Sequence, residues 1–336
     1  MLKVAIIGFG GIAQTHRHAY WYHNKEGMPI KMVAACDTDP SKFRNMTVIN
    51  IPLWSDIVDE LPFNEYTDWK EMLEKEKPDL VDICLPTKFH NPIAIEALKM
   101  GYNVLSEKPM AENYEQCLEM IEAAKENNKM LMIGHCVRFS AQYEYLKKAV
   151  DENLYGKVVS SEFFRYSPIP TWGGLDWRAE AGVAGSCIAE LNVHDVDYIC
   201  SLFGNPEKLS CVLESKVFPY DFGDTVFYYK DHTVKIKSAW FDETEQFRAG
   251  FVVNFEKGTL ELKGGKLTFT DNNGNTEEID TGNYGVFMAE TKYFMELIME
   301  QKENTKNPPE DSANTIYALE RMYESAAKGA EILEYK

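Results

Sequence analysis

The sequence predicts an α/β protein of two domains, the first of which is built on a doubly wound parallel sheet. Over the first 135 residues, short and almost continuously apolar runs alternate with amphipathic stretches, as parallel strands and their covering helices do. In several runs of the second half, apolar and polar residues alternate, as in antiparallel strands with one buried face. A length of 336 residues exceeds what one compact core accommodates and favours two domains.

The predicted strands of the first half are short, and helical stretches separate most of them. The strands cover residues 3–7, 30–36, 64–67, 79–85, 103–106 and 130–134. The helices cover residues 11–23, 69–75, 92–100 and 114–127. Asp39-Pro40 opens a further short helix, as its N-cap and first helical residue. Alternation of this kind predicts right-handed crossovers between the strands.

The loop after the first predicted strand has the pattern Gly8-Phe9-Gly10-Gly11-Ile12-Ala13. Gly8 permits a tight turn, Gly10 lets a pyrophosphate approach the backbone, and Ala13 lets the next helix pack closely on the strand. That helix directs its N–H groups and positive dipole end at the phosphates. We therefore assign Gly8, Gly10, Gly11 and Ile12 to dinucleotide binding. The alternative is a Rossmann domain without a cofactor.

Asp37 closes the second predicted strand at the position of a ribose-binding carboxylate. A carboxylate there accepts a hydrogen bond from the ribose 2′-hydroxyl and repels a 2′-phosphate. Thr38 follows instead of an arginine that could pair with the phosphate, although Lys42 and Arg44 are close in the sequence. The sequence therefore predicts NAD in preference to NADP.

Composition excludes several classes of partner. A net charge of −18 without a basic stripe argues against nucleic acid, and no apolar run approaches the ~20 residues of a membrane span. Met1 is followed almost at once by the first strand, which leaves no room for a signal peptide and predicts a cytoplasmic protein. The seven cysteines form neither a CxxC pair nor a cluster with histidine, so we expect reduced thiols and no structural metal.

Two loops at the carboxyl ends of predicted strands carry residues suited to a site, because open parallel sheets bind ligands at that edge. One loop contains Pro86, Thr87 and His90, and the other contains Glu107 and Lys108, followed by a proline; we expect these five residues to contribute to the cofactor site. The Lys108 ammonium can hold a substrate hydroxyl and stabilise alkoxide character as hydride leaves carbon. A solvated surface lysine is the alternative, but the place of Lys108 between an acid and a proline at a strand end favours function.

The segment 185–197 is the second candidate site. Apolar residues at 188, 191, 196 and 199 predict a helix, on which Glu190, His194 and Asp197 would share one face. An imidazole exchanges a proton near neutral pH, and a nearby carboxylate can orient it. An ordinary surface charge pair remains the alternative.

Together these motifs resemble the Gfo/Idh/MocA family of oxidoreductases, which includes glucose–fructose oxidoreductase and inositol dehydrogenases. The resemblance covers essentially the whole chain. It rests on the glycine loop with His16, Pro86-Thr87 with His90, Glu107-Lys108-Pro109, Arg138-Phe139, Trp177-Arg178, and Gly185 with His194 and Asp197.

The resemblance implies a Rossmann domain followed by an α/β domain with a large, open, mostly antiparallel sheet. It also implies that Lys108 polarises the substrate hydroxyl and that His194 is the general acid/base. Glu190 stands where the family usually has Asp, and Asn192 where it usually has Gly. The extra methylene moves the carboxylate by roughly 1.5 Å, and this puts the proton relay in doubt or signals an altered substrate geometry.

We expect an NAD-binding domain at 1–135, a substrate-binding and oligomerisation domain at 136–310, and a C-terminal helix at 311–336 that packs back on the body. Strands in the second half are predicted at 157–166, 208–217, 224–229, 233–240, 247–255, 259–262 and 266–270, and helices at 286–300 and 311–333. A broad open sheet exposes a face that something must cover, so we expect a homodimer or homotetramer.

The loop 168–177 contains Trp172 and Trp177, which can stack on sugar rings or fill the core. Arg178 can bind a polar substrate group or pair with Glu180, and His90, His135 and Arg138 are weaker candidates for the same cleft.

The leading hypothesis is a dehydrogenase that oxidises a secondary alcohol of a sugar, sugar acid or cyclitol, with Lys108, Glu190 and His194 reading several hydroxyls of the polyol. A second hypothesis is an NAD-dependent glycoside hydrolase that oxidises its substrate transiently. A third is a non-catalytic dinucleotide or sugar sensor, which would have no need of a proton relay.

Overall fold

The computed structural model describes residues 1–45, 62–169, 185–241, 246–282 and 284–336. The chain divides into two compact units. The first unit consists of Met1–Phe139 and Tyr284–Ala313, and the second of Ser140–Asn283 and Asn314–Lys336. The expected division differs from this one, because residues 284–310 were assigned to the second domain and belong to the first unit.

The first unit contains a six-stranded parallel sheet in the order β3-β2-β1-β4-β5-β6. Strands β1 to β3 are added toward one edge of the sheet and β4 to β6 toward the other, which is the strand order of a dinucleotide-binding doubly wound fold. Its strands are β1 (Leu2–Ile7), β2 (Ile30–Cys36), β3 (Asn64–Tyr66), β4 (Leu80–Ile83), β5 (Asn103–Ser106) and β6 (Leu131–Ile133). The prediction of a doubly wound parallel sheet is confirmed.

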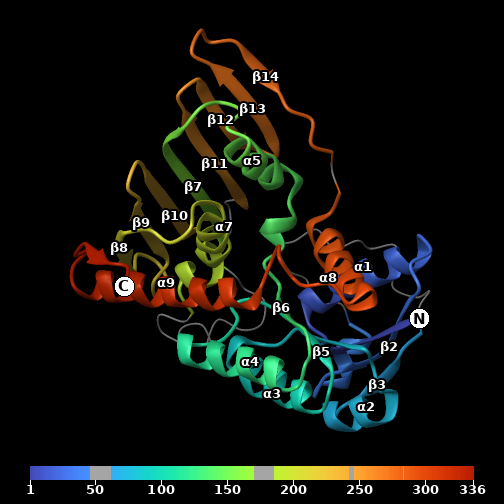
Figure 1. Cartoon of the computed structure of the whole chain (residues 1–336). Coiled ribbons are helices and arrows are strands. Elements are labelled where there is room, and N and C mark those ends of the chain that lie inside the picture. The colour runs from blue at the N-terminus through green and yellow to red at the C-terminus, as the bar shows by residue number, and fades with distance from the viewer. Residues whose placement is uncertain (46–61, 170–184, 242–245, 283) are drawn as a thin grey trace. The chain divides into compact units, whose positions relative to one another are not determined.

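Four helices described by the structure connect strands of this sheet (Figure 1): α1 (Gly11–Lys25), α2 (Trp69–Glu76), α3 (His90–Lys99) and α4 (Tyr114–Glu126). The first unit also contains α8 (Val286–Glu300), which follows the strands of the second unit in the chain, and 3₁₀ turns at Pro40–Phe43, Thr87–Phe89 and Cys136–Phe139. Asp68 caps α2 by accepting a hydrogen bond from the backbone N–H of Lys70 at 2.8 Å. Asp39 caps the 3₁₀ turn through Ser41 at 3.0 Å, as the Asp-Pro pair predicts.

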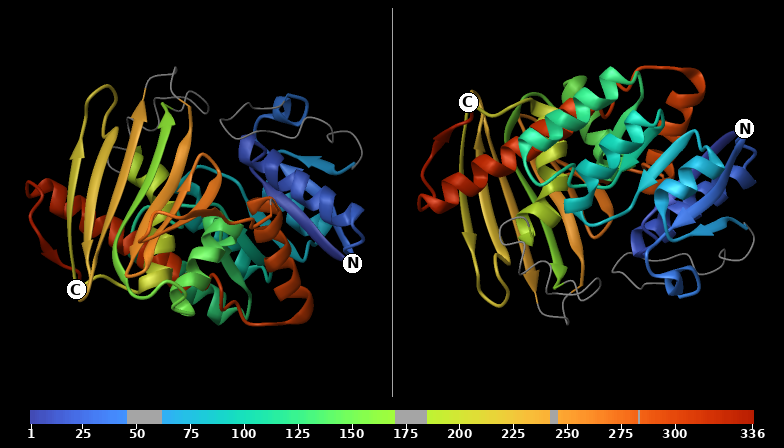
Figure 2. Two further views of the ribbon diagram at one scale, coloured as in Figure 1. Left: turned by 90° about the horizontal axis from the view of Figure 1, so that it is seen from above. Right: turned by 90° about the horizontal axis from the view of Figure 1, so that it is seen from below.

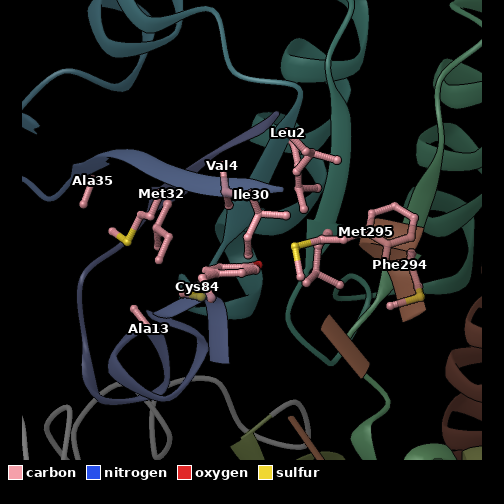
Figure 3. Close-up of a cluster of buried hydrophobic side chains, with 14 of the residues drawn as sticks. Leu2, Val4, Ala13, Ile30, Met32, Ala35, Cys84, Phe294 and Met295 are labelled. Carbon is pink, nitrogen blue, oxygen red and sulfur yellow. The ribbon is translucent and has the colours of Figure 1, made fainter. Parts of the chain in front are cut away.

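The core of the first unit explains why α8 belongs to it. Apolar side chains of β1 and β2 pack together with Phe294 and Met295 of α8 (Figure 3). Phe294 and Met295 are fully buried. The backbone carbonyl of Met288 also lies 2.9 Å from Nε2 of His23 in α1. Burial of this apolar face therefore fixes α8 against α1, although some 260 residues of chain separate them.

The second unit contains a nine-stranded sheet in the order β14-β13-β12-β11-β7-β10-β9-β8-β15. All neighbours are antiparallel except β7 and β10, which are parallel. The strands are β7 (Val158–Pro168), β8 (Lys208–Glu214), β9 (Phe222–Tyr228), β10 (Thr233–Phe241), β11 (Arg248–Phe255), β12 (Gly258–Lys263), β13 (Lys266–Asp271), β14 (Thr276–Glu278) and β15 (Leu333–Glu334). The expected large, mostly antiparallel sheet is confirmed.

Among the residues that the structure describes, three helices accompany this sheet: α5 (Ala141–Asp151), α7 (Val193–Phe203) and α9 (Pro309–Ala327). Figure 2 shows α7 and α9 along one face of the sheet. The hydroxyl of Ser325 in α9 accepts a hydrogen bond from the backbone N–H of Cys211 in β8 at 2.9 Å. The sequence prediction missed α5. It was also wrong to extend the last helix to residue 333, because the chain turns at Gly329, whose φ is +72°, and pairs β15 with β8.

Among the described residues, no helix combines the length and the apolar composition needed to cross a bilayer.

Candidate active site

The loop after β1 forms an open cradle at the start of α1. Gly8 has a φ of +88°, and a Cβ there would lie 2.4 Å from the carbonyl oxygen of Cys84, so the turn requires glycine. A Cβ at Gly10 would meet no described atom within 4 Å. Gly10 is also the N-cap of α1 and brings no side chain to the first N–H groups of the helix. Gly11 and Ile12 follow as the first residues of α1. Open space beside uncapped N–H groups fits the pyrophosphate of a dinucleotide.

Asp37 lies just beyond β2, where two backbone N–H groups orient its carboxylate. Phe9 donates to Oδ2 at 2.8 Å and Asp39 to Oδ1 at 2.9 Å. Lys42 Nζ lies 3.1 Å from Oδ2, and Arg44 pairs with Glu65. The glycine loop and the carboxylate are thus joined directly, which fits a ribose bound alongside the pyrophosphate.

The loop after β4 is tied to the loop after β5 by His90. Pro86 is exposed and Thr87 is half-buried, whereas His90 is only 1% exposed. Its Nδ1 lies 2.7 Å from the carbonyl oxygen of Pro109, and its Nε2 lies 2.6 Å from that of Leu85. Burial lowers the pKa of His90. We expected His90 among the residues that bind the cofactor, but both ring nitrogens face backbone carbonyls and join the two loops.

Glu107 and Lys108 follow β5 directly. Glu107 is 6% exposed, and its Oε2 accepts a hydrogen bond from the backbone N–H of Lys108 at 3.1 Å. Lys108 is half-buried, and the peptide bond between Lys108 and Pro109 is cis. The other carboxylate oxygen of Glu107 lies 3.1 Å from Nε2 of His16 in α1.

His16, Asp82 and Cys84 form a buried cluster of groups that are able to bind metals. Nδ1 of His16 lies 2.8 Å from Oδ2 of Asp82. Two ligands of one tetrahedral zinc ion, each about 2.1 Å from the metal, stand about 3.4 Å apart. The Cys84 thiol lies 3.5 Å from Asp82 Oδ1, and burial raises its pKa, which disfavours the thiolate that a metal requires. We therefore interpret the cluster as a hydrogen-bonded network.

In the second unit, His194 follows a π-helical turn. The turn spans Ile188–Asn192 and runs into α7, so the predicted helix is present. The i, i+4 spacing assumed for Glu190 and His194 does not apply across it, since a π-helix closes its hydrogen bonds at i+5. Both side chains are half-buried. Asp197 is fully buried instead and accepts a hydrogen bond from Thr315 of α9 at 3.2 Å.

The sequence analysis missed the carboxylate beside His194. Asp195 is fully buried and receives two hydrogen bonds from Arg165 of β7, both of 2.9 Å. A signal was present, because Arg165 occupies an inward position in the alternation of β7, two residues after the buried Phe163. A charged side chain at such a position requires a buried partner.

Of the other residues predicted to bind substrate, the structure describes Arg138 and His135. Arg138 is 6% exposed, and its Nη1 donates to Asp311 Oδ2 at 2.8 Å and to the carbonyl oxygen of Lys306 at 3.0 Å. These contacts fix Arg138 within the first unit, and we do not place it in the substrate site. His135 is buried. The remaining three predicted substrate residues lie outside the described part of the chain: Trp172, Trp177 and Arg178.

Comparison with known families decides the identity of this arrangement. Residues 2–135 match the family model described as "Oxidoreductase family, NAD-binding Rossmann fold", and residues 143–261 match the "GFO/IDH/MocA C-terminal domain". The chain belongs to the GFO/IDH/MocA family. The resemblance inferred from the motifs is confirmed by both matches.

Two curated members of the GFO/IDH/MocA family are similar to the chain over part of their length. D-Glucoside 3-dehydrogenase of Escherichia coli is 29% identical over 209 residues, which is 61% of this chain and 55% of that protein. Levoglucosan dehydrogenase of Pseudarthrobacter phenanthrenivorans is 26% identical over 226 residues, 64% of this chain and 54% of that protein. The matches thus span about half the length of these relatives.

Solved structures share the fold over nearly the whole chain. A levoglucosan dehydrogenase in complex with NADH and levoglucosan superposes with a TM-score of 0.85 at 18% sequence identity, covering 99% of each chain. This superposition shows that the two proteins have the same fold.

Proposed function

We propose that the protein is an NAD-dependent dehydrogenase that oxidises a secondary alcohol of a sugar, sugar acid or cyclitol. The observation that carries the proposal is the cradle of the first unit, where the glycine loop, the start of α1 and the Asp37 carboxylate are joined by the hydrogen bond from Phe9 to Asp37. Bound NAD would supply the hydride acceptor at this site. The names of the relatives, which are dehydrogenases of a glucoside and of an anhydrosugar, support the same class of substrate.

NAD is preferred over NADP in this proposal because of the surroundings of Asp37. A ribose 2′-hydroxyl can donate to this carboxylate, whereas a 2′-phosphate would meet its negative charge. Lys42 already bonds to Asp37, and Arg44 to Glu65, so each cation is engaged by an acid. We therefore expect a clear preference for the unphosphorylated cofactor.

The chemistry that we propose uses Lys108, His194 and Glu190. The Lys108 ammonium holds the substrate hydroxyl and stabilises negative charge on its oxygen. His194 accepts the hydroxyl proton as general base, and Glu190 orients the imidazole or binds a second hydroxyl. Lys108 and His194 belong to different units, so the mechanism requires that both reach one substrate. Trp172, Trp177 and Arg178 remain predicted contributors to the polyol pocket.

We also propose that the protein forms a homodimer or homotetramer through the sheet of the second unit. Half-exposed aromatic side chains cluster on the outward positions of this sheet. Phe164 stacks on Tyr166, and Tyr166 packs against Phe241 with ring centroids 5.5 Å apart. A second copy would remove this apolar surface from water. Tyr166→Glu should convert the oligomer to a monomer in light-scattering measurements, and an unchanged mass would contradict the proposed interface.

The test of the proposed function is a panel of sugars, sugar acids and inositols, assayed with NAD and NADP by the absorbance of the reduced cofactor. The expected result is stoichiometric reduction of NAD with at least one polyol. Cleavage of a glycoside without accumulation of NADH would favour the hydrolase. Binding of NAD and sugar without turnover by the full chain would favour a sensor.

A further inference from the structure

A chain of buried charged groups runs beneath the Glu107–Lys108 loop of the first unit. His16 and Asp82 are fully buried, and Glu107 is 6% exposed. His16 contacts Asp82 through Nδ1 at 2.8 Å and Glu107 through Nε2 at 3.1 Å. Tyr20, one turn further along α1, donates to the same oxygen of Asp82 at 2.7 Å. One imidazole therefore lies between the carboxylate of Asp82 in β4 and that of Glu107, which directly follows the neighbouring strand β5.

The surroundings favour an imidazolium at His16, because Nδ1 hydrogen-bonds to Asp82 and Nε2 faces Glu107 at ion-pair distance. A neutral imidazole carries one N–H and could donate to only one of the two carboxylates. Burial, the largest single effect, lowers the pKa of His16, but the charges and hydrogen bonds of Asp82 and Cys84 together raise it well above its ordinary value. Burial raises the pKa of Glu107, but the neighbouring His16 and Lys108 together lower it below its ordinary value. Both shifts favour the charged forms of His16 and Glu107.

Stability alone does not account for this network. Burying ions is costly, and apolar residues of similar volume often stabilise a core at least as well as a buried ion pair. The network has two carboxylates for one cation, which makes its burial still less favourable. Perturbed buried ions of this kind concentrate at functional sites, and here the last of them, Glu107, adjoins Lys108.

We propose that His16 is a positioning residue for Lys108 and acts through the Glu107 carboxylate. The imidazolium holds Oε1 of Glu107 and leaves Oε2 directed at the backbone N–H of Lys108, 3.1 Å away. A Cβ on Gly134 would come within 3.2 Å of Oε1, so the neighbouring backbone confines the carboxylate closely. His90 contacts the carbonyl oxygen of Pro109 at 2.7 Å, so the loop is held on both sides of Lys108. The inference rests on the proposed function only where it concerns turnover.

The experiment compares His16→Gln with a matched control, Tyr20→Phe, which removes a hydrogen bond to Asp82 but leaves the contact with Glu107. Amide hydrogen exchange of Lys108 is measured on the free protein and needs no substrate. We expect His16→Gln to accelerate it by about tenfold or more, because the acceptor on Glu107 loses its anchor. Tyr20→Phe should leave the exchange rate of Lys108 unchanged.

Turnover provides the second readout. His16→Gln should lower kcat by about tenfold to a hundredfold, as misplacement of a catalytic group does, while KM for NAD stays near that of the wild type. Glu107→Gln should lower kcat as well, and the double variant should be no slower than the slower single variant, because both act through one contact. Asp82→Asn, which removes the charge that keeps His16 protonated, should reproduce part of the effect.

Three results would overturn the proposal. The first is a folded His16→Gln protein with wild-type exchange at Lys108, and the second is a double variant in which the two losses of kcat add. The third is loss of folding in both His16→Gln and Asp82→Asn, which would assign the network to stability. If the wild type oxidises none of the alcohols, the proposed function fails, but the exchange comparison still decides whether His16 anchors the loop.

Discussion

The two units bury charge in different ways. In the second unit, Arg165 and Asp195 form a balanced pair with two hydrogen bonds of 2.9 Å. In the first, one imidazolium, that of His16, serves the two carboxylates of Asp82 and Glu107. A guanidinium stays charged at every accessible pH, whereas an imidazolium depends on its surroundings. The comparison indicates a permanent scaffold beneath α7 and a titratable support beneath the Lys108 loop.

The largest expected effect is on the permanent pair. Arg165→Met leaves the Asp195 carboxylate buried without its partner, which should lower the free energy of unfolding by about 3–5 kcal/mol. Urea denaturation measures this loss. Replacing Asp195 by Leu in the same protein should recover much of it, because both charges are then gone. A single-variant loss below about 1 kcal/mol would mean that the pair is no scaffold.

The next effect concerns catalysis. Lys108→Met removes the ammonium but retains most of the volume of the side chain, so kcat should fall by about 10²–10³ while the Kd for NAD changes little. Steady-state kinetics and quenching of intrinsic fluorescence by NAD give the two values. Loss of NAD binding would refute the assignment of Lys108 to the substrate hydroxyl.

The dependence on pH separates the two regions. The pKa of His16 is raised on folding, so its charge stabilises the folded state fully below its ordinary pKa of 6.5. This contribution of His16 to stability is lost as the pH rises through its raised pKa in the folded protein. The difference in unfolding free energy between wild type and His16→Gln should therefore shrink from neutral to alkaline pH. The difference in unfolding free energy between wild type and Arg165→Met should not change with pH over this range. If it changed with pH as much as the difference for His16→Gln, the two buried networks would not differ in their response to pH.

The smallest effect is expected at Glu190. If its carboxylate favours protonated His194, Glu190→Gln should lower the pKa of the general base. The acid limb of the kcat profile would then move to lower pH by up to about one unit. Glu190→Asp, which keeps the charge, should retain a limb close to that of the wild type. An unchanged profile in Glu190→Gln would exclude this carboxylate from the mechanism.

The spacing of apolar residues was sufficient to predict helices and strands whose bounds depend only on their own residues. The strands Ile30–Cys36 and Asn103–Ser106 and the helix Val286–Glu300 agree residue for residue with the prediction. Asp37 could be placed because it ends a predicted strand. The helix Ala141–Asp151 was missed although its buried residues Tyr143, Leu146 and Ala149 recur every three positions.

Features that depend on distant residues could not be predicted. Asp82 and Glu107 reach His16 only because β4 and β5 follow β1 in the sheet order, and Asp82 looked like one polar residue in an apolar strand. The π-helical turn before His194 was not predicted either, because such turns are rare and the apolar spacing indicates only a helix. The sequence therefore offers candidates for the site, but not the buried groups that hold them in place.

The account depends most on Lys108 and His194 acting on one substrate. A crystal structure of the protein with NAD and an alcohol that it oxidises tests this directly. The expected result is a single hydroxyl within about 2.7–3.2 Å of both Lys108 Nζ and a ring nitrogen of His194. A bound alcohol that contacts only one of these groups, or neither, would contradict the proposed mechanism.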